Sequence, residues 1–322
     1  MYFPVSGVDV NPLIPPFVAF VVSCLTAPAG VSGAFLLLPF QMSVMNYTSP
    51  SVSPTNLIYN IVAIPGGLYR FIKEGRMAWP LAWVIIVGTL PGVFLGSWVR
   101  IFYLPDPEAF QLFVGCVLLF LGIRLVLEFT GGSKKQKAQN EHLEQKFKEQ
   151  VAHVKMETHK KVTAGLPADA IVTTKTFSLK KIEYEFWGET YSFPTLTIFI
   201  LAVVVGLIGG VYGIGGGSII APFCVSILGL PVYTVAGAAL CGTFLTSICG
   251  VGFYAILATT SIGATTNVAP DWLLGTLFGA GGLAGTYFGA YMQKYLRETI
   301  VKGIMAVLVI FLALRYILQF FF

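Results

Sequence analysis

The chain has 322 residues, of which 56% are hydrophobic and 11% are charged, and its mean hydropathy is +0.78. So few charges cannot cover the surface of a soluble domain, which excludes a soluble protein. The net charge of +5 does not indicate a nucleic-acid partner, because eleven of the twenty basic residues lie between Thr130 and Phe193 among eight acidic ones. That mixture is typical of a solvated helix.

Outside this polar segment, apolar stretches of about the length that crosses a bilayer fall into two groups of four. The first group covers residues 13–45, 56–71, 79–103 and 109–127, and the second covers 196–230, 234–257, 272–292 and 301–322. The sequence therefore predicts an all-α polytopic membrane protein. We expect a first transmembrane repeat unit in residues 1–128, a small cytoplasmic α+β insert in 129–193 and a second transmembrane repeat unit in 194–322.

The first stretch of each group is interrupted by glycines. Residues 13–45 would form a straight helix of about 50 Å, whereas the hydrocarbon core is about 30 Å thick. The interruptions read "GVSG" from Gly30 to Gly33 and "GIGGGS" from Gly213 to Ser218. Glycine admits positive φ and lets another backbone come close. We expect both segments to be broken or re-entrant, with second legs that begin at Ala34 and Ser218.

These two stretches belong to an internal repeat. "GVSGAFLLLPFQMSV" at 30–44 aligns with "GIGGGSIIAPFCVSI" at 213–227, and the alignment continues without a gap to Gly67 and Gly250. After an insertion of ten residues in the second copy, residues 79–98 match 272–291. A tandem duplication of one membrane unit is typical of secondary transporters.

The basic residues bear on the orientation of the two units. Arg70, Lys73 and Arg76 follow the second stretch of the first unit, whereas Lys294, Arg297 and Lys302 follow the third stretch of the second unit. If each first stretch is a hairpin that returns to its own side, the repeat is inverted. Every basic loop except that at Arg100 is then cytoplasmic, as the positive-inside rule requires. We favour an inverted repeat, and a parallel one remains the alternative.

The breaks suggest a binding site for a small anion. The leg that follows each break presents N–H groups without helical partners and about half a positive charge, with no membrane-embedded lysine needed. Polar side chains on the neighbouring stretches could complete the shell of an oxyanion. The alternatives are tight packing for the glycines and interhelical hydrogen bonds for the polar residues. The candidate binding residues are Gly30, Ser32, Gly33, Asn56, Asn60, Gly213, Gly215, Gly216, Gly217, Ser218, Thr243 and Thr246.

Other glycines recur at four-residue spacing, at Gly92 and Gly96 and at Gly281, Gly285 and Gly289. This spacing places small residues on one helix face, so we predict helix packing faces there.

The polar segment divides into two parts. Residues 134–161 carry apolar residues at helical spacing among charges, which predicts an amphipathic helix. Residues 171–193 are β-branched and aromatic and predict strands. The histidines, His142, His153 and His159, lack the i,i+4 spacing of a metal site, so we predict no metal and no cofactor.

The motif "GIGGGSIIAPF", the polar small-residue stretch "YTVAGAALCGTFLTSICG" after it, the weaker copy "GVSGAFLLLPF" and the two-unit layout resemble the TauE/SafE family of sulfite exporters and sulfonate permeases. The resemblance implies transport of small sulfur-containing anions, such as sulfite or organosulfonates, across the cytoplasmic (inner) membrane. It also implies that Gly213, Gly215, Gly216, Gly217 and Ser218 bind the anion, with Gly30, Ser32 and Gly33 opposite.

We therefore expect a multi-pass secondary transporter that is not an enzyme, with a small anion and the lipid bilayer as partners and with no nucleic acid. A homo-oligomer is compatible with the sequence. Two alternatives stay open, namely a cation-coupled carrier of another small solute and a membrane-anchored scaffold that acts through the insert.

Overall fold

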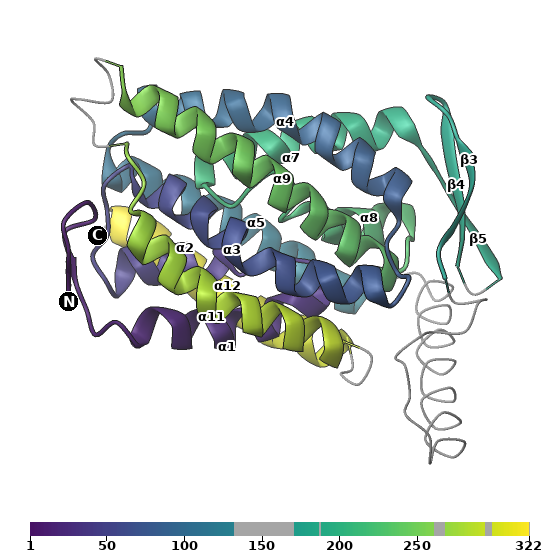
Figure 1. The fold of residues 1–322 in the computed structure, drawn as a ribbon, viewed down its shortest axis with the longest axis horizontal. Helices are drawn as coiled ribbons and strands as arrows, with labels where there is room; N and C mark the ends of the chain where they lie inside the picture. The colour runs from purple at the N-terminus through teal and green to yellow at the C-terminus, as the bar shows by residue number, and fades with distance from the viewer. Residues whose placement is uncertain (132–170, 187, 261–267, 294–297, 322) are drawn as a thin grey trace, which may run out of the picture.

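The computed structural model describes residues 1–131, 171–186, 188–260, 268–293 and 298–321 (Figure 1). The first unit consists of β1 (Tyr2–Phe3), β2 (Val8–Asp9), α1 (Ile14–Thr26), a 3-10 turn (Ala27–Ala29), α2 (Ala34–Ser43), α3 (Val52–Lys73), α4 (Trp79–Phe102) and α5 (Pro107–Gly131). A sheet of β3 (Thr173–Phe177), β4 (Lys181–Phe186) and β5 (Glu189–Pro194) follows. The second unit consists of α7 (Thr195–Tyr212), α8 (Ile220–Leu228), α9 (Val232–Ala258), α11 (Trp272–Met292) and α12 (Glu298–Phe321).

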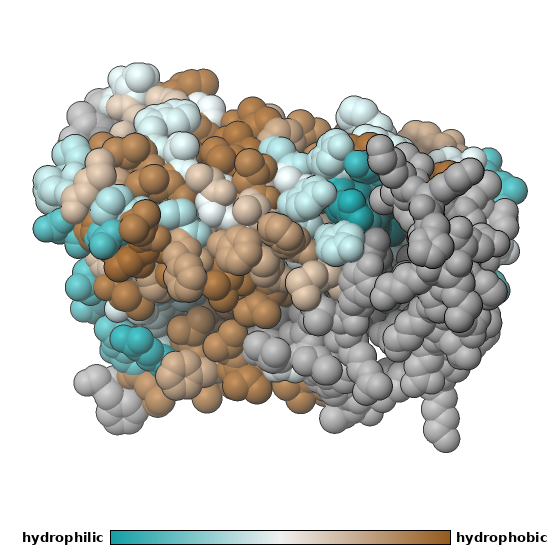
Figure 2. All heavy atoms as spheres, turned by 60° about the horizontal axis from the view of Figure 1, so that its bottom comes forward, coloured by the Kyte–Doolittle hydropathy of each residue, from teal (hydrophilic) through white to brown (hydrophobic). Residues whose placement is uncertain are grey.

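The helices are long and apolar, as predicted. Four of them, α4, α5, α7 and α9, have the length and composition to cross a membrane. Large apolar side chains such as Trp83 and Phe94 are exposed on the outside of the bundle. Figure 2 shows apolar side chains across the middle of the visible face and polar ones toward its two ends. The prediction of an all-α membrane fold is confirmed, with the small sheet as its β component.

The first apolar segment of each unit is broken and folds back, as predicted. In the first unit Gly30 has φ 71° and ends the 3-10 turn, and α2 then runs back beside α3. In the second unit α7 ends at Gly213, which has φ 80°. One boundary was wrong: the second leg expected from Ser218 begins at Ile220, because residues 216–219 form turns.

The start of each hairpin lies at the same end of the bundle as the first residues of the helix that follows the hairpin. In the first unit, Asp271 at the start of α11 links both elements: it accepts a 2.8 Å hydrogen bond from Ser6 and donates one of 2.8 Å from its backbone to Thr55. In the second unit α7 follows β5 directly, and α9 begins beside β4, where the hydroxyls of Tyr184 and Thr234 lie 2.9 Å apart. Each hairpin therefore returns to the end from which it came.

Helices of one unit pack mainly against helices of the other. Gly92 and Gly96 of α4 lie against the backbone of α7, and Gly285 of α11 lies so close to α1 that an added Cβ would be 2.5 Å from the carbonyl oxygen of Phe20. The predicted glycine packing faces are thus confirmed. In the repeat alignment α4 is equivalent to α11, and α1 is equivalent to α7. The α4–α7 contact is therefore equivalent to the α11–α1 contact. Between the units, α3 and α9 are antiparallel, since Gly67 lies against Leu240 and Gly250 lies against Leu57.

The strands predicted in residues 171–193 are present. They form an antiparallel sheet in the order β3-β4-β5, which lies at one end of the bundle (Figure 1). One face of the sheet is buried through Ile182, Tyr184 and Phe193, and Val172 donates a 2.9 Å hydrogen bond to the carbonyl of Gly75. The predicted amphipathic helix and the three histidines, His142, His153 and His159, lie outside the described residues.

Candidate functional site

Asn60, in the first half of α3, joins the two breaks. Its carboxamide oxygen accepts a hydrogen bond from the Ser32 hydroxyl in the first break. Its Nδ2 donates to the carbonyl of Ile214 in the second break at 2.9 Å, and to the Ser247 hydroxyl of α9 at 3.2 Å. All three side chains are fully buried or nearly so. One amide of the first unit therefore satisfies polar groups from three other segments.

Asn56 makes a second bridge one turn earlier on α3. Its Nδ2 donates to the carbonyls of Ala34 at 2.9 Å and Gly213 at 3.2 Å. Its oxygen accepts a 3.2 Å hydrogen bond from Gln41 of α2. A carbonyl at a break in hydrocarbon has no water to bond, so these amides satisfy the acceptors that the breaks expose. In this conformation both asparagines therefore make hydrogen bonds to other segments, as the alternative interpretation expects.

The second break is also held from the α9 side. The backbone N–H of Gly216 donates to the Thr246 hydroxyl at 2.9 Å. The Ser218 hydroxyl donates to the carbonyl of Ile214 and lies 3.4 Å from the hydroxyl of Thr243. The hydroxyls of Thr243 and Thr246 donate in turn to carbonyls of their own helix, at 2.9 and 2.7 Å. Threonines on α9 thus supply acceptors for the break.

The N–H groups at the starts of the two legs have protein partners. The N–H of Ala34 donates to the Ser32 hydroxyl at 3.2 Å. The N–H of Ser218 donates to the carbonyl of Gly215 at 3.4 Å, and that of Ile220 to Gly217 at 3.2 Å. Of these bonds, that of Ala34 has a side-chain hydroxyl as acceptor, and the other two have backbone carbonyls. In this conformation the N–H groups that we expected to face an anion therefore bond to Ser32 and to the carbonyls of the second break.

The glycines of the second break lie in close contact with the helices around them. An added Cβ at Gly213 would lie 2.5 Å from the Cα of Ser53, and one at Gly215 would lie 2.8 Å from the Ser247 hydroxyl. Gly216 faces the side chain of Thr89. These contacts leave no room for an added Cβ, so in this conformation each of these glycines is packed against a neighbouring segment.

The remaining predicted glycines differ in their position. Gly33 lies against the Tyr59 hydroxyl, and Gly217 lies against the carbonyl of Ala239 in α9. Gly30 is at the tip of the first hairpin, where an added Cβ would be 2.6 Å from the Cα of Ala236. Gly30 therefore packs against the start of α9, apart from the asparagine contacts that bring the other candidates together.

The sequence interpretation missed Tyr212, whose hydroxyl donates a 3.0 Å hydrogen bond to the carbonyl of Phe35 and so ties the second break to α2. It also missed Gln41 of α2. A signal for Tyr212 was present, because a tyrosine in an apolar stretch directly before a glycine run needs a partner for its hydroxyl.

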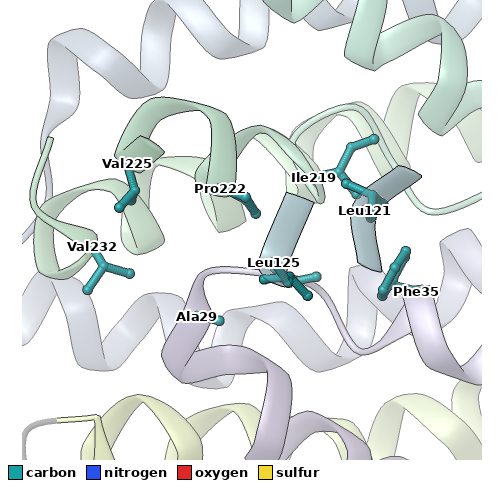
Figure 3. A pocket seen from close by; sticks show the side chains of 9 residues that line it. Ala29, Phe35, Leu121, Leu125, Ile219, Pro222, Val225 and Val232 are labelled. Atoms are coloured by element: carbon teal, nitrogen blue, oxygen red, sulfur yellow. The ribbon is translucent and has the colours of Figure 1, made fainter. Parts of the chain in front are cut away.

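A small cavity of about 20 Å³ lies between the two hairpins and α5. In Figure 3, Phe35 of the first hairpin, Ile219 of the second and Leu121 and Leu125 of α5 converge on it. It has room for about one water molecule but no polar side chain to hold it. The cavity is therefore apolar space beside the breaks and not itself a site for an ion.

These features define a class of protein. Apolar helices around two broken segments that meet at a buried polar cluster are typical of polytopic membrane carriers. A family model described as "Sulfite exporter TauE/SafE" matches residues 16–316, so the chain belongs to the TauE/SafE family of membrane transporters. It is a multi-pass protein of the cell membrane.

One curated relative supports the class. The chain is 22% identical over 211 residues to the probable membrane transporter protein YunE of Bacillus subtilis (strain 168), and the match covers 63% of each chain. The chain thus spans a little under two thirds of the length of this relative. No solved structure matches the chain at a significant level.

Proposed function

We propose that the chain is a secondary carrier that moves small sulfur-containing anions, such as sulfite or organosulfonates, across the cytoplasmic (inner) membrane, and that it is not an enzyme. The observation that carries the proposal is the convergence of both breaks on Asn56 and Asn60, inside the helical bundle. The name of the matching family, which refers to sulfite export, supports the choice of anion.

The anion would bind at the start of α2 and in the turn of residues 216–219 that leads into α8. Helix N-termini attract anions through their N–H groups and partial positive charge. The N–H groups of Ala34 and Gly216 now bond to the hydroxyls of Ser32 and Thr246, at 3.2 and 2.9 Å. A sulfite or sulfonate oxygen would replace each hydroxyl as the acceptor. The proposed site consists of Gly30, Ser32, Gly33, Asn56, Asn60, Gly213, Gly215, Gly216, Gly217, Ser218, Thr243 and Thr246.

Alternating exposure of this site would follow from an inverted repeat. The antiparallel course of α3 and α9 supports that arrangement, with residues 1–128 and 194–322 as the two units and 129–193 as a cytoplasmic insert. Single cysteines at Lys73 and Thr259, in a variant without the five native cysteines, test it. An impermeant thiol reagent outside the cell should label only the cysteine at 259. Labelling of both from the same side would contradict the inverted repeat and support the parallel one.

Transport is tested in proteoliposomes with labelled sulfite or sulfoacetate. The wild-type protein should give saturable flux that depends on the protein, and Gly216→Ala should abolish it. Because an alanine at 216 would meet Thr89, the double variant Gly216→Ala/Thr89→Gly provides the control, together with Thr89→Gly alone. Flux that stays lost in the double variant indicates contact between the anion and Gly216. Flux that returns would show that Gly216 only avoids Thr89, and would reject it as a binding residue.

A scaffold that acts through the insert predicts a different result. Ile182 and Tyr184 of the sheet are buried, so the deletion should be confined to residues 132–170 and closed with a short Gly/Ser linker. A carrier should retain flux after this deletion. Loss of flux in a variant that still folds would assign the working part to the insert.

A further inference from the structure

Arg100, in the last turn of α4, is 0% exposed. Its guanidinium carbon lies 3.7 Å from the ring centroid of Phe110, and its Nη1 donates to the carbonyl of Leu104. Its Nε and Nη2 have no hydrogen-bond partner in the part of the chain that the structure describes. Burial of a charge is costly unless the charge is paired and its donors are satisfied. Two donors of a cation are therefore available inside the protein.

Three buried hydroxyls surround the same space. Tyr254 of α9 is within electrostatic range of Arg100, and its hydroxyl faces those of Ser97 on α4 and Ser53 on α3. All three side chains are 0% exposed, and within the described residues the hydroxyls of Ser97 and Ser53 have no hydrogen-bond partner other than Tyr254. Three helices thus bring buried hydroxyls together at Tyr254, which is within electrostatic range of Arg100.

The acid nearest to Arg100 does not satisfy it. Asp106 contributes to the electrostatic surroundings of Arg100, but it is solvent-exposed and its carboxylate accepts a 2.9 Å hydrogen bond from the N–H of Ala109. Solvent weakens the attraction of an exposed carboxylate for a buried cation. The cluster of Arg100, Ser97, Tyr254 and Ser53 therefore has excess positive charge and excess donors.

The opposite end of the bundle contains a buried arginine that is paired. Arg76 lies 2.7 Å from the Glu74 carboxylate and donates to the side chain of Gln293 and, at 3.2 Å, to the carbonyl of Ala290. An arginine can thus be buried in this fold together with a counter-charge, which Arg100 lacks among the described residues.

The repeat makes the contrast sharper. Continued for a few residues past Gly67/Gly250 and past 98/291, the alignment of the two units pairs Arg100 with Gln293, Ser97 with Ala290, Ser53 with Ala236 and Tyr254 with Phe71. The equivalent place in the other unit thus has three apolar residues and one amide, and Gln293 and Ala290 there accept hydrogen bonds from Arg76. Both places therefore hold a buried arginine, and they differ in that Arg76 is paired with Glu74, whereas the place of Arg100 contains three buried hydroxyls.

The cluster also adjoins the second break. Ser53 is the residue against which Gly213 packs, at 2.5 Å from an added Cβ. Arg100 lies near the end of α4, a helix of about 36 Å whose other end is next to the sheet (Figure 1). The cluster is therefore at the end of the bundle opposite the β3–β5 sheet, beside the tip of the α7–α8 hairpin.

We propose that Arg100, Ser97, Tyr254 and Ser53 form a recognition site for a small oxyanion on the side of the membrane opposite the insert. The guanidinium supplies two N–H donors in the planar arrangement that suits an oxyanion, and the hydroxyls supply further donors to its other oxygens. The identity of this anion as the transported sulfite or sulfonate rests on the proposed function, whereas binding at the cluster does not.

Binding of labelled sulfite, sulfoacetate and sulfate to the purified protein tests the proposal, with flux measured in parallel. Arg100→Gln should raise the concentration for half-saturation at least tenfold, and Tyr254→Phe and Ser97→Ala should raise it about threefold to tenfold. Arg100→Lys keeps the positive charge but lacks the planar pair of N–H donors, so it should bind the anions as weakly as Arg100→Gln does. The exposed Arg315 provides the control, since Arg315→Gln removes the same charge elsewhere and should bind as wild type does.

The folding of the variants separates recognition from structure. Arg100→Gln removes a buried charge without a counter-ion and should melt no lower than wild type. If Arg100→Gln fails to fold, the binding measured for Tyr254→Phe and Ser97→Ala, which each remove one hydroxyl, shows whether the cluster binds the anion.

Each result supports or overturns a defined claim. If all cluster variants bind the anions as wild type does and the wild type shows flux, the recognition site is rejected and the proposed carrier function stands. Binding that depends on Arg100 without any flux keeps the site and rejects the carrier. Failure of the wild type to bind any of the three anions overturns both.

Discussion

The two breaks occupy equivalent positions in the repeat, but they are built differently. The first has Ser32 and Ala34 where the second has Gly215 and Gly217. Gly215 has φ 79°, whereas Asn46 is the one non-glycine residue with positive φ in the described part of the chain. The first break therefore has an ordinary backbone at Ser32, whose hydroxyl donates to the Asn60 side chain. The second break contributes the backbone carbonyl of Ile214 to the same side chain.

The helices that support the breaks differ in the same way. Asn60 of α3 and Thr243 of α9 are equivalent in the repeat, yet Asn60 bonds to Ser32, Ile214 and Ser247. Thr243 donates within its own helix, to Ala239 at 2.9 Å. The support of both breaks thus comes mainly from one helix, so equivalent substitutions should have unequal effects.

The largest difference is expected between Asn60→Leu and Thr243→Val. Leucine would leave the Ile214 carbonyl and the two hydroxyls without their amide partner, at a cost of about 2–3 kcal/mol. Valine at 243 removes a hydroxyl that bonds chiefly within α9 and should cost less than about 0.5 kcal/mol. Thermal unfolding of the purified variants in one detergent measures both. Equal destabilisation would show that α3 and α9 contribute equally.

A second difference is expected between Gly217→Ala and Ala34→Gly, which exchange the residues of the two copies. A Cβ at Gly217 would collide with the α9 backbone at Ala239 and Thr243, and overpacking of this kind costs about 2 kcal/mol. Ala34→Gly only loosens the start of α2 and should cost about 0.5 kcal/mol. If both variants unfold at the same temperature, close backbone contact is not what distinguishes the second break.

The sequence was sufficient for the position of both breaks and for most helix limits, because these follow from apolar length and glycine placement. α11 begins at Trp272 and ends at Met292 as predicted, whereas the second leg begins two residues later than expected. The network at Asn56 and Asn60 could not be predicted in detail, because it depends on which carbonyls of the other unit lie opposite α3.

Arg100 shows the same limit more clearly. A basic residue near the end of an apolar stretch has the same pattern whether it lies in a loop or inside the protein, and we had assigned it to a loop. Its burial depends on Tyr254 and Phe110, which come from two other helices. Tertiary contacts between segments far apart in the sequence leave no periodic signal that the sequence alone could reveal.

The smallest expected effect concerns the hydrogen bond between the sheet and the start of α9 in the second unit. The hydroxyls of Tyr184 in β4 and Thr234 in α9 lie 2.9 Å apart, which ties the sheet to the start of α9. In Tyr184→Phe this bond is lost, but Thr234 still donates to the carbonyl of Pro231 at 3.0 Å. We therefore expect a loss of about 1 kcal/mol in unfolding free energy and no change in flux. Thr276→Ala, on an exposed side chain of α11, serves as the control for loss of a hydroxyl. A fall in flux without a fall in stability would mean that the sheet acts on the second break during transport, so that the two breaks differ in control as well as in construction.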